Sequence, residues 1–164
     1  MNFFLRKEKK YEKETNNKSQ LILEEETLLL ILDMQGKILS NIKANQILIF
    51  NIKKLIDTCN LLNVSIAITE QNPSKLGKTI DSILDCKEYP KFEKMEFSCC
   101  NNNNFINFIS EYNFKNIIVC GIESHICILQ TSSDLLQQDL NILIPRDAIG
   151  SRHEIDNDTA FLRL

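Results

Sequence analysis

The sequence predicts a three-layer α/β/α domain with a Rossmann-like, mostly parallel sheet and helices on both faces. Two observations support this fold class. Short apolar runs, typical of strands buried on both faces, alternate with segments whose apolar residues recur every three or four positions. Strands that alternate with helices connect through right-handed crossovers, which place helices on both faces of a parallel sheet.

The first half of the chain alternates two strands with one long helix. Residues 27–32 form a short apolar run that ends abruptly at Asp33, as expected for a buried strand. Between residues 48 and 62 the apolar spacing predicts a helix with one buried face. A second strand is expected over 64–68. A cluster of Asn, Pro and Gly then predicts a loop over 71–78.

The second half continues the alternation with shorter segments. A strand is expected over 92–97 and a helix over 105–112, where aromatic and aliphatic residues share one face. Strands over 117–120 and 142–144 enclose a helix over 126–138. A last helix is expected to start at residue 154 and to run to the last residue.

Composition narrows the classes of partner. The chain has 164 residues, 43% of them hydrophobic, which is enough for one domain with a sizeable core. Its net charge of −3 gives no basic field for nucleic acid or an anionic membrane, so neither is expected as a partner. The longest apolar runs fall far short of the ~20 residues that a membrane span requires.

Residues 1–24 differ from the rest, and we expect a charged, disordered tail ahead of a single domain over 25–164. Residues 1–20 hold six Lys or Arg and three Glu, with little apolar periodicity. The apolar stretch near the start is too short for a secretory signal, and the Glu residues disfavour a transit peptide. A cytoplasmic location is therefore expected, with organellar targeting by the tail as the alternative.

The cysteines and histidines disfavour a metal centre or a disulfide scaffold. Six Cys show no CxxC pairing, and only two His are present to join them. Reduced thiols, no metal and no cofactor are expected.

Cys127 is the most informative residue. It ends the segment 121–127 that joins a strand to a helix, where Ser124 is a candidate N-cap that would place Cys127 in the first helical turn. Free N–H groups and the positive helix end would lower the pKa of the thiol, and the same groups could hold an oxyanion. The alternative is a small buried apolar side chain. His125 lies about 200° around the helix from Cys127, so it is not expected to be the base.

Polar residues at the ends of other strands are expected to converge with Cys127 on one rim of the sheet. Asp33 ends the first strand and is either a general base or a cap on the next segment. Lys94 near the third strand would keep that carboxylate ionised and favour a thiolate. Lys75 and Lys78 are alternative lysines in a loop, and His153 is expected to be solvated or to cap a helix.

Five strings in the order seen here resemble the isochorismatase-like cysteine hydrolase family, from about residue 27 to the last residue. The second string resembles the branch of isochorismatase-domain-containing proteins. The strings are LLILDMQ (29–35), TEQNPSKLGKT (69–79), KMEFSC (94–99), VCGIESHICILQTSSD (119–134) and IPRDAIGSR (144–152).

The resemblance implies a hydrolase with a catalytic triad of Asp33, Lys94 and Cys127. It also implies a cis peptide before Glu123, which would aim the N–H groups of Glu123 and Cys127 at an oxyanion. Asp33 would take the thiol proton, and water would cleave the resulting thioester of a small amide- or ester-like substrate. The residues expected to line the substrate pocket are Gln35, Gln71 and Phe97.

Departures from the family's pattern refine this expectation. The nicotinamidase branch holds a metal through His residues, but no His precedes residue 125 here, so metal and nicotinamide are disfavoured. The family commonly forms homo-oligomers, which we also expect here. A family domain normally continues through another strand, so the C-terminal part is expected to be incomplete.

Two other functions stay open. The first is a catalytically weak or inactive protein of the same fold that works as an oligomeric binding or interaction module. The second is a thiol redox protein built on Cys99, Cys100 and Cys127, which the absence of CxxC disfavours.

Overall fold

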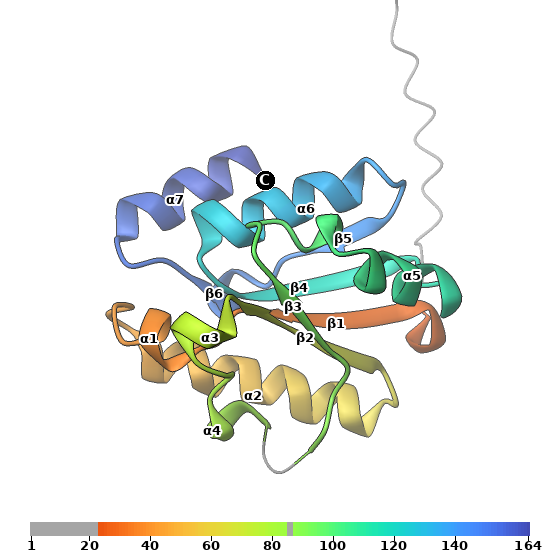
Figure 1. The fold of residues 1–164 in the computed structure, drawn as a ribbon, viewed down its shortest axis with the longest axis horizontal. Helices are drawn as coiled ribbons and strands as arrows, with labels where there is room; N and C mark the ends of the chain where they lie inside the picture. The colour runs from red at the N-terminus through yellow and green to blue at the C-terminus, as the bar shows by residue number, and fades with distance from the viewer. Residues whose placement is uncertain (1–22, 85–86) are drawn as a thin grey trace, which may run out of the picture.

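A parallel sheet forms the middle layer of the molecule in the computed structural model, which describes residues 23–84 and 87–164 (Figure 1). The strand order is β3-β2-β1-β4-β5, and a short β6 also pairs with β4. Every pairing between strands of the described residues is parallel. The strands are β1 (Thr27–Leu32), β2 (Ser65–Gln71), β3 (Lys91–Lys94), β4 (Asn116–Ile122), β5 (Asn141–Leu143) and β6 (Ile149–Gly150).

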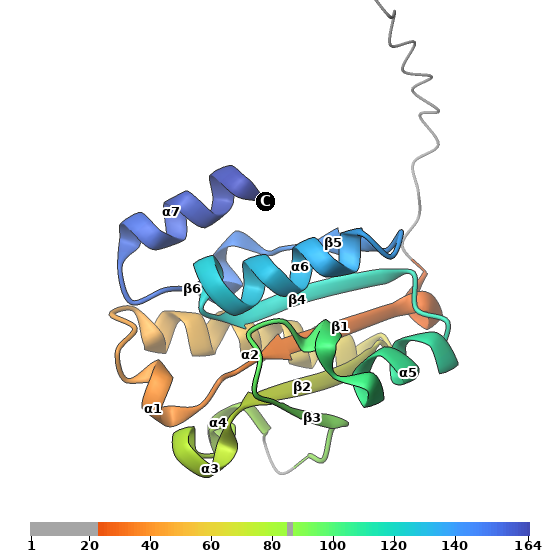
Figure 2. The ribbon, with the colours of Figure 1, turned by 45° about the horizontal axis from the view of Figure 1, so that its top comes forward.

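Helices cover both faces of this sheet, so the predicted three-layer fold class is confirmed. One face carries α1, α2, α3 and α4, and the other carries α5, α6 and α7 (Figures 1 and 2). The helices are α1 (Gly36–Leu39), α2 (Asn45–Leu61), α3 (Pro73–Leu76), α4 (Asp81–Leu84), α5 (Asn103–Glu111), α6 (Leu129–Leu136) and α7 (Glu154–Arg163). None of the helices in the described ranges is long and apolar enough to cross a membrane.

The alternation of side chains along β1 divides the core into two layers. Leu29 and Ile31 pack with the buried face of α2, whereas Leu28, Leu30 and Leu32 pack toward α5 and α6. All six residues of β1 are buried, because the strand lies in the centre of the sheet between β2 and β4. The continuous apolar run in the sequence is the direct consequence of burial on both faces.

Most predicted elements are found within a few residues of their expected bounds, but two differ. The predicted loop over 71–78 contains α3, and β2 extends to Gln71. The predicted strand over 92–97 ends earlier, because the chain bends away from the sheet after Lys94. Met95 and Phe97, which made that segment look like a strand, are 66% and 51% exposed.

Residues 1–22 lie outside the described residues, and with them nearly all of the charged tail expected over 1–24. The boundary between that tail and the domain over 25–164 stays a prediction.

Gly121 allows β4 to approach β1 more closely than any other residue could. It pairs with Leu32 in the sheet register and has a φ of +114°. A Cβ at this position would lie 2.1 Å from the carbonyl oxygen of Leu32. The approach matters for the site, because Asp33 follows Leu32 and the turn toward Cys127 follows Gly121.

We therefore expect Gly121→Ala to lower the free energy of unfolding by more than about 3 kcal/mol, since backbone atoms must move to admit the methyl group. Gly77→Ala is the matched control, because Gly77 has a φ of +83° but nothing within 4 Å of its added Cβ. That variant should lose about 1 to 3 kcal/mol from backbone strain alone, because a φ of +83° with a ψ of −176° strongly favours glycine. Urea denaturation measures both, and equal losses would contradict the close-approach argument.

Candidate active site

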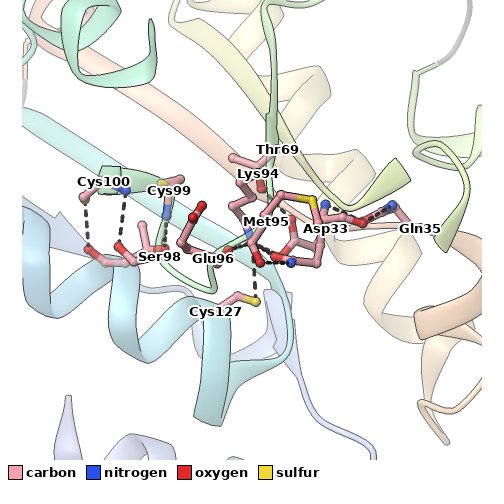
Figure 3. A network of polar contacts seen from close by, with 12 residues as sticks. Asp33, Gln35, Thr69, Lys94, Met95, Glu96, Ser98, Cys99, Cys100 and Cys127 are labelled. Atoms are coloured by element: carbon pink, nitrogen blue, oxygen red, sulfur yellow. Dashed lines mark hydrogen bonds and ion pairs between the residues drawn. The ribbon is translucent and has the colours of Figure 1, made fainter. Parts of the chain in front are cut away.

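Asp33, Lys94 and Cys127 meet at the carboxyl ends of the strands, as the sequence predicted for polar residues on this rim (Figure 3). The Lys94 ammonium lies between the other two groups. Its Nζ donates to Asp33 Oδ2 at 2.7 Å and to Cys127 Sγ at 3.6 Å. All three residues are buried, with exposed fractions of 0%, 4% and 7%. The arrangement brings a carboxylate, an ammonium and a thiol together away from bulk water.

Asp33 is held by β2 as well as by Lys94. Its N–H donates to the carbonyl of Thr69, and the Thr69 hydroxyl donates to Asp33 Oδ1 at 2.7 Å. Asp33 has a φ of +54°, a conformation that Asp tolerates better than most residues. Thr69 is a partner of Asp33 that the sequence pattern did not predict. The pairing of Leu32 with Thr69 in neighbouring parallel strands is the signal that could have found it.

Gln71 positions Lys94 rather than standing free at the rim. Its Oε1 accepts from Lys94 Nζ at 2.8 Å, and its Nε2 donates to the carbonyl of Met95 at 2.7 Å. Lys94 Nζ also donates to the carbonyl of Glu96 at 3.5 Å. These bonds fold the chain after β3 around the ammonium, which explains why the strand ends at Lys94.

The other two candidates for the substrate pocket differ in access. Gln35 is fully buried, and its amide exchanges hydrogen bonds with the backbone of Gln71 at 2.8 and 3.0 Å. It therefore supports the rim from behind in this structure, and its contact with a substrate stays a prediction. Phe97 is half exposed on the bend that follows β3. Its contact with a substrate stays a prediction.

The expectation that the helix end lowers the pKa of the Cys127 thiol is wrong in this structure. Burial raises that pKa to about 12, and the nearby Asp33 carboxylate adds to the rise. Lys94 acts in the opposite direction but does not outweigh them. The resting thiol is therefore protonated near neutral pH, so a base must remove its proton when it reacts.

The turn that carries Cys127 joins β4 to α6. The peptide between Ile122 and Glu123 is cis, as the family resemblance implied. The Glu123 carbonyl accepts from the N–H groups of Ile126 and Ile128, which closes the turn around Cys127. Glu123, and not Ser124, occupies the N-cap position of this helix, a π-helical turn over Ser124–Ile128.

Neither histidine contacts the thiol. His125 Nδ1 hydrogen-bonds to the Ser151 hydroxyl at 2.9 Å, away from Cys127, in agreement with the expectation from helical geometry. His153 is exposed at the N-cap position of α7 without a capping side-chain bond. Lys75, in α3 and not in a loop as expected, and Lys78 are exposed as well. Within residues 23–84 and 87–164, no three His, Cys, Asp or Glu residues are grouped so as to hold a metal ion.

The other described thiols differ from Cys127 in ways that matter for labelling. Burial raises the pKa of Cys59 to about 11 and also raises the pKa values of Cys99 and Cys120. A hydrogen bond from Cys99 lowers the pKa of the half-buried Cys100 thiol, and a bond from Ser98 adds to this effect. Among the described thiols, a simple alkylating reagent should therefore react with Cys100 first, whatever the role of Cys127.

Comparison with known proteins relates this site to a single family. The model of the isochorismatase domain matches residues 27–164. Isochorismatase family protein 1A of Dictyostelium discoideum is 33% identical over 144 residues, which cover 84% of this chain and 69% of that protein. Isochorismatase domain-containing protein 2 of Danio rerio is 32% identical over 138 residues, 84% of this chain and 70% of that protein.

Solved structures give the same result. The structure of MAR1 ribonuclease from Caenorhabditis elegans superimposes with a TM-score of 0.81 at 34% identity, covering 87% of this chain and 73% of that one. The YcaC gene product of Escherichia coli, described as an octameric hydrolase of unknown specificity, has a TM-score of 0.80 at 17% identity. The match covers 85% of this chain and 71% of the YcaC chain. At 17% identity it shows the fold alone.

The buried carboxylate should have a measurable effect on the thiol. Because Asp33 raises the pKa of Cys127 and Lys94 lowers it, Asp33→Asn should lower that pKa and speed alkylation of Cys127 by iodoacetamide at a given pH. A fall of one pKa unit would increase the thiolate fraction about tenfold. Mass spectrometry of the Cys127 peptide measures the rate.

Cys100 is the internal control in that experiment, because its pKa does not respond to Asp33. Its labelling rate should stay unchanged between the two proteins, and circular dichroism should verify that the variant is folded. Slower labelling of Cys127 in the folded variant would contradict the electrostatic role given to Asp33.

Proposed function

The chain belongs to the isochorismatase domain family of hydrolases, the membership that its motifs predicted, and we propose that it cleaves a small carbonyl compound with Cys127 as the nucleophile. The observation that carries this proposal is the buried cluster in which Lys94 bonds both Asp33 and the Cys127 sulfur. Asp33 is the only carboxylate among the groups bonded to Lys94 in the described residues. It is therefore the base in our proposal.

The first half-reaction forms a thioester. Asp33 takes the thiol proton as Cys127 Sγ attacks the substrate carbonyl, so that little free thiolate forms despite a pKa of about 12. The backbone N–H groups of Glu123 and Cys127 hold the resulting oxyanion. Collapse of this intermediate expels the amine or alcohol, which takes the proton back from Asp33.

The second half-reaction regenerates the enzyme. Asp33 removes a proton from a water molecule, whose oxygen attacks the thioester carbonyl. The same N–H groups hold the second oxyanion, and its collapse releases the acid and returns the proton to the Cys127 sulfur. Lys94 stays positively charged throughout and fixes the Asp33 carboxylate beside the thiol through the 2.7 Å bond.

A carbonyl substrate fits this site better than RNA, although one similar protein bears the name of a ribonuclease. The net charge of −3 and a sequence pI near 5.5 provide no basic field for a phosphate backbone. A cysteine nucleophile also suits an acyl group. Self-association stays a prediction, although one protein of this fold is described as octameric.

A screen of amides and esters, begun with 4-nitrophenyl acetate, tests the proposal. The wild type should release 4-nitrophenolate with acetylation of Cys127, and Cys127→Ala should lose this reaction entirely, because no other group in the cluster can form the thioester. Mass spectrometry locates the acetyl group. Cys100→Ala is the matched control and should keep full activity.

Three results would contradict the proposal that the chain cleaves a small carbonyl compound with Cys127. Turnover that survives in Cys127→Ala would exclude this nucleophile. Cleavage of RNA by the wild type but not by Cys127→Ala would favour a different substrate class. A folded wild type that acetylates only Cys100 would favour the alternative, an inactive binding or interaction module of the same fold.

A further inference from the structure

The Glu123 carboxylate is held by a residue outside the triad. The side chain of Glu123 is only 6% exposed, yet it carries a charge beside the nucleophile's turn. Arg152 supplies three donors to it: Nη2 to Oε1 at 2.6 Å, Nε to Oε2 at 3.1 Å and its backbone N–H to Oε2 at 3.2 Å. This two-pronged contact fixes both the position and the plane of the carboxylate.

A second link joins the same two segments. The buried hydroxyls of Ser124 and Ser151 are hydrogen-bonded to each other, and the Ser151 hydroxyl also bonds His125 Nδ1 at 2.9 Å. His125 Nε2 lies 3.9 Å from an Asp156 carboxylate oxygen at the start of α7. Three consecutive residues of the nucleophile's turn, Glu123 to His125, are thus tied to the chain that follows β6.

These bonds are separate from those of the triad. Asp33 and Lys94 are held by Thr69 and Gln71, on β2. Within the described residues, no hydrogen bond joins Asp33 or Lys94 to Ser151 or Arg152. Burial alone would raise the pKa of Glu123, but the hydrogen bonds and charge of Arg152 lower it, so the carboxylate is ionised.

We propose that Arg152 is a positioning residue for the oxyanion site, acting through the Glu123 carboxylate. This inference rests on the proposed function, in which the Glu123 N–H is one of the two oxyanion donors. Arg152 anchors the side chain of the residue whose backbone must point at the developing charge. It also neutralises a buried carboxylate that would otherwise repel that charge.

Two reagents that react with the Cys127 thiol distinguish a positioning role of Arg152 from general support of the fold. Acetylation of Cys127 by 4-nitrophenyl acetate passes through an oxyanion, whereas alkylation by iodoacetamide displaces iodide directly and forms none. The groups that shift the pKa of Cys127 are Asp33 and Lys94, and Arg152 is not among them. Alkylation therefore reports the thiol alone, and acetylation reports the thiol together with the oxyanion site.

We expect Arg152→Met to slow acetylation of Cys127 about 10- to 100-fold, with alkylation changed by less than about twofold. Arg152→Lys keeps the charge but loses the planar fork, so its acetylation rate should lie between those of Arg152→Met and the wild type. Glu123→Gln combined with Arg152→Met removes the repulsive charge and should recover part of the loss.

Arg146→Met is the matched control. Arg146 is an exposed arginine shortly before β6, paired at 3.7 Å with Asp158 and not with the nucleophile's turn. Both reactions should keep their wild-type rates in this variant. Circular dichroism should verify the fold of every protein in the series.

The outcomes separate the two proposals. Acetylation at the wild-type rate in Arg152→Met, or an equal loss of both reactions, would overturn the positioning role and leave the proposed function standing. If the wild type is alkylated at Cys127 by iodoacetamide but is not acetylated there, the proposed function is overturned, and this inference with it.

Discussion

The buried ion pair between Lys94 and Asp33 is the interaction on which the site depends. Its two side chains are 1% and 0% exposed, so both charges are removed from water at a large cost in hydration. Further hydrogen bonds offset part of this cost: the Thr69 hydroxyl donates to the Asp33 carboxylate, and Lys94 donates to the amide oxygen of Gln71. Such a pair requires that the ends of β1, β2 and β3 meet in register, which the parallel sheet provides.

Two groups of residues from different parts of the fold surround Cys127 and its turn. The ion pair and its β2 partners supply the proton acceptor, whereas the segment after β6 holds the turn whose N–H groups face the oxyanion in our proposal. The thiol between them is buried and protonated at rest. This arrangement favours a reaction in which proton transfer and attack occur together, and it protects the sulfur from adventitious alkylation.

Much of the fold could be predicted from local pattern, since burial on both faces leaves a continuous apolar run and helix periodicity leaves a spaced one. The pattern failed after Lys94, because Met95 and Phe97 are apolar but exposed. It also failed at the N-cap, where Ser124 bonds Ser151 instead of capping its own helix. Contacts with distant segments decided both places, and no local pattern contains them.

The sequence by itself determined the class of fold, the rim where the chemistry lies and the three residue types that meet there. The tertiary structure alone decided how those residues behave. Lys94 bonds partners 61 and 33 positions away, and the pKa of Cys127 is raised because desolvation and the Asp33 charge outweigh Lys94. Both effects depend on distance and burial in three dimensions, which a local pattern in the sequence does not contain.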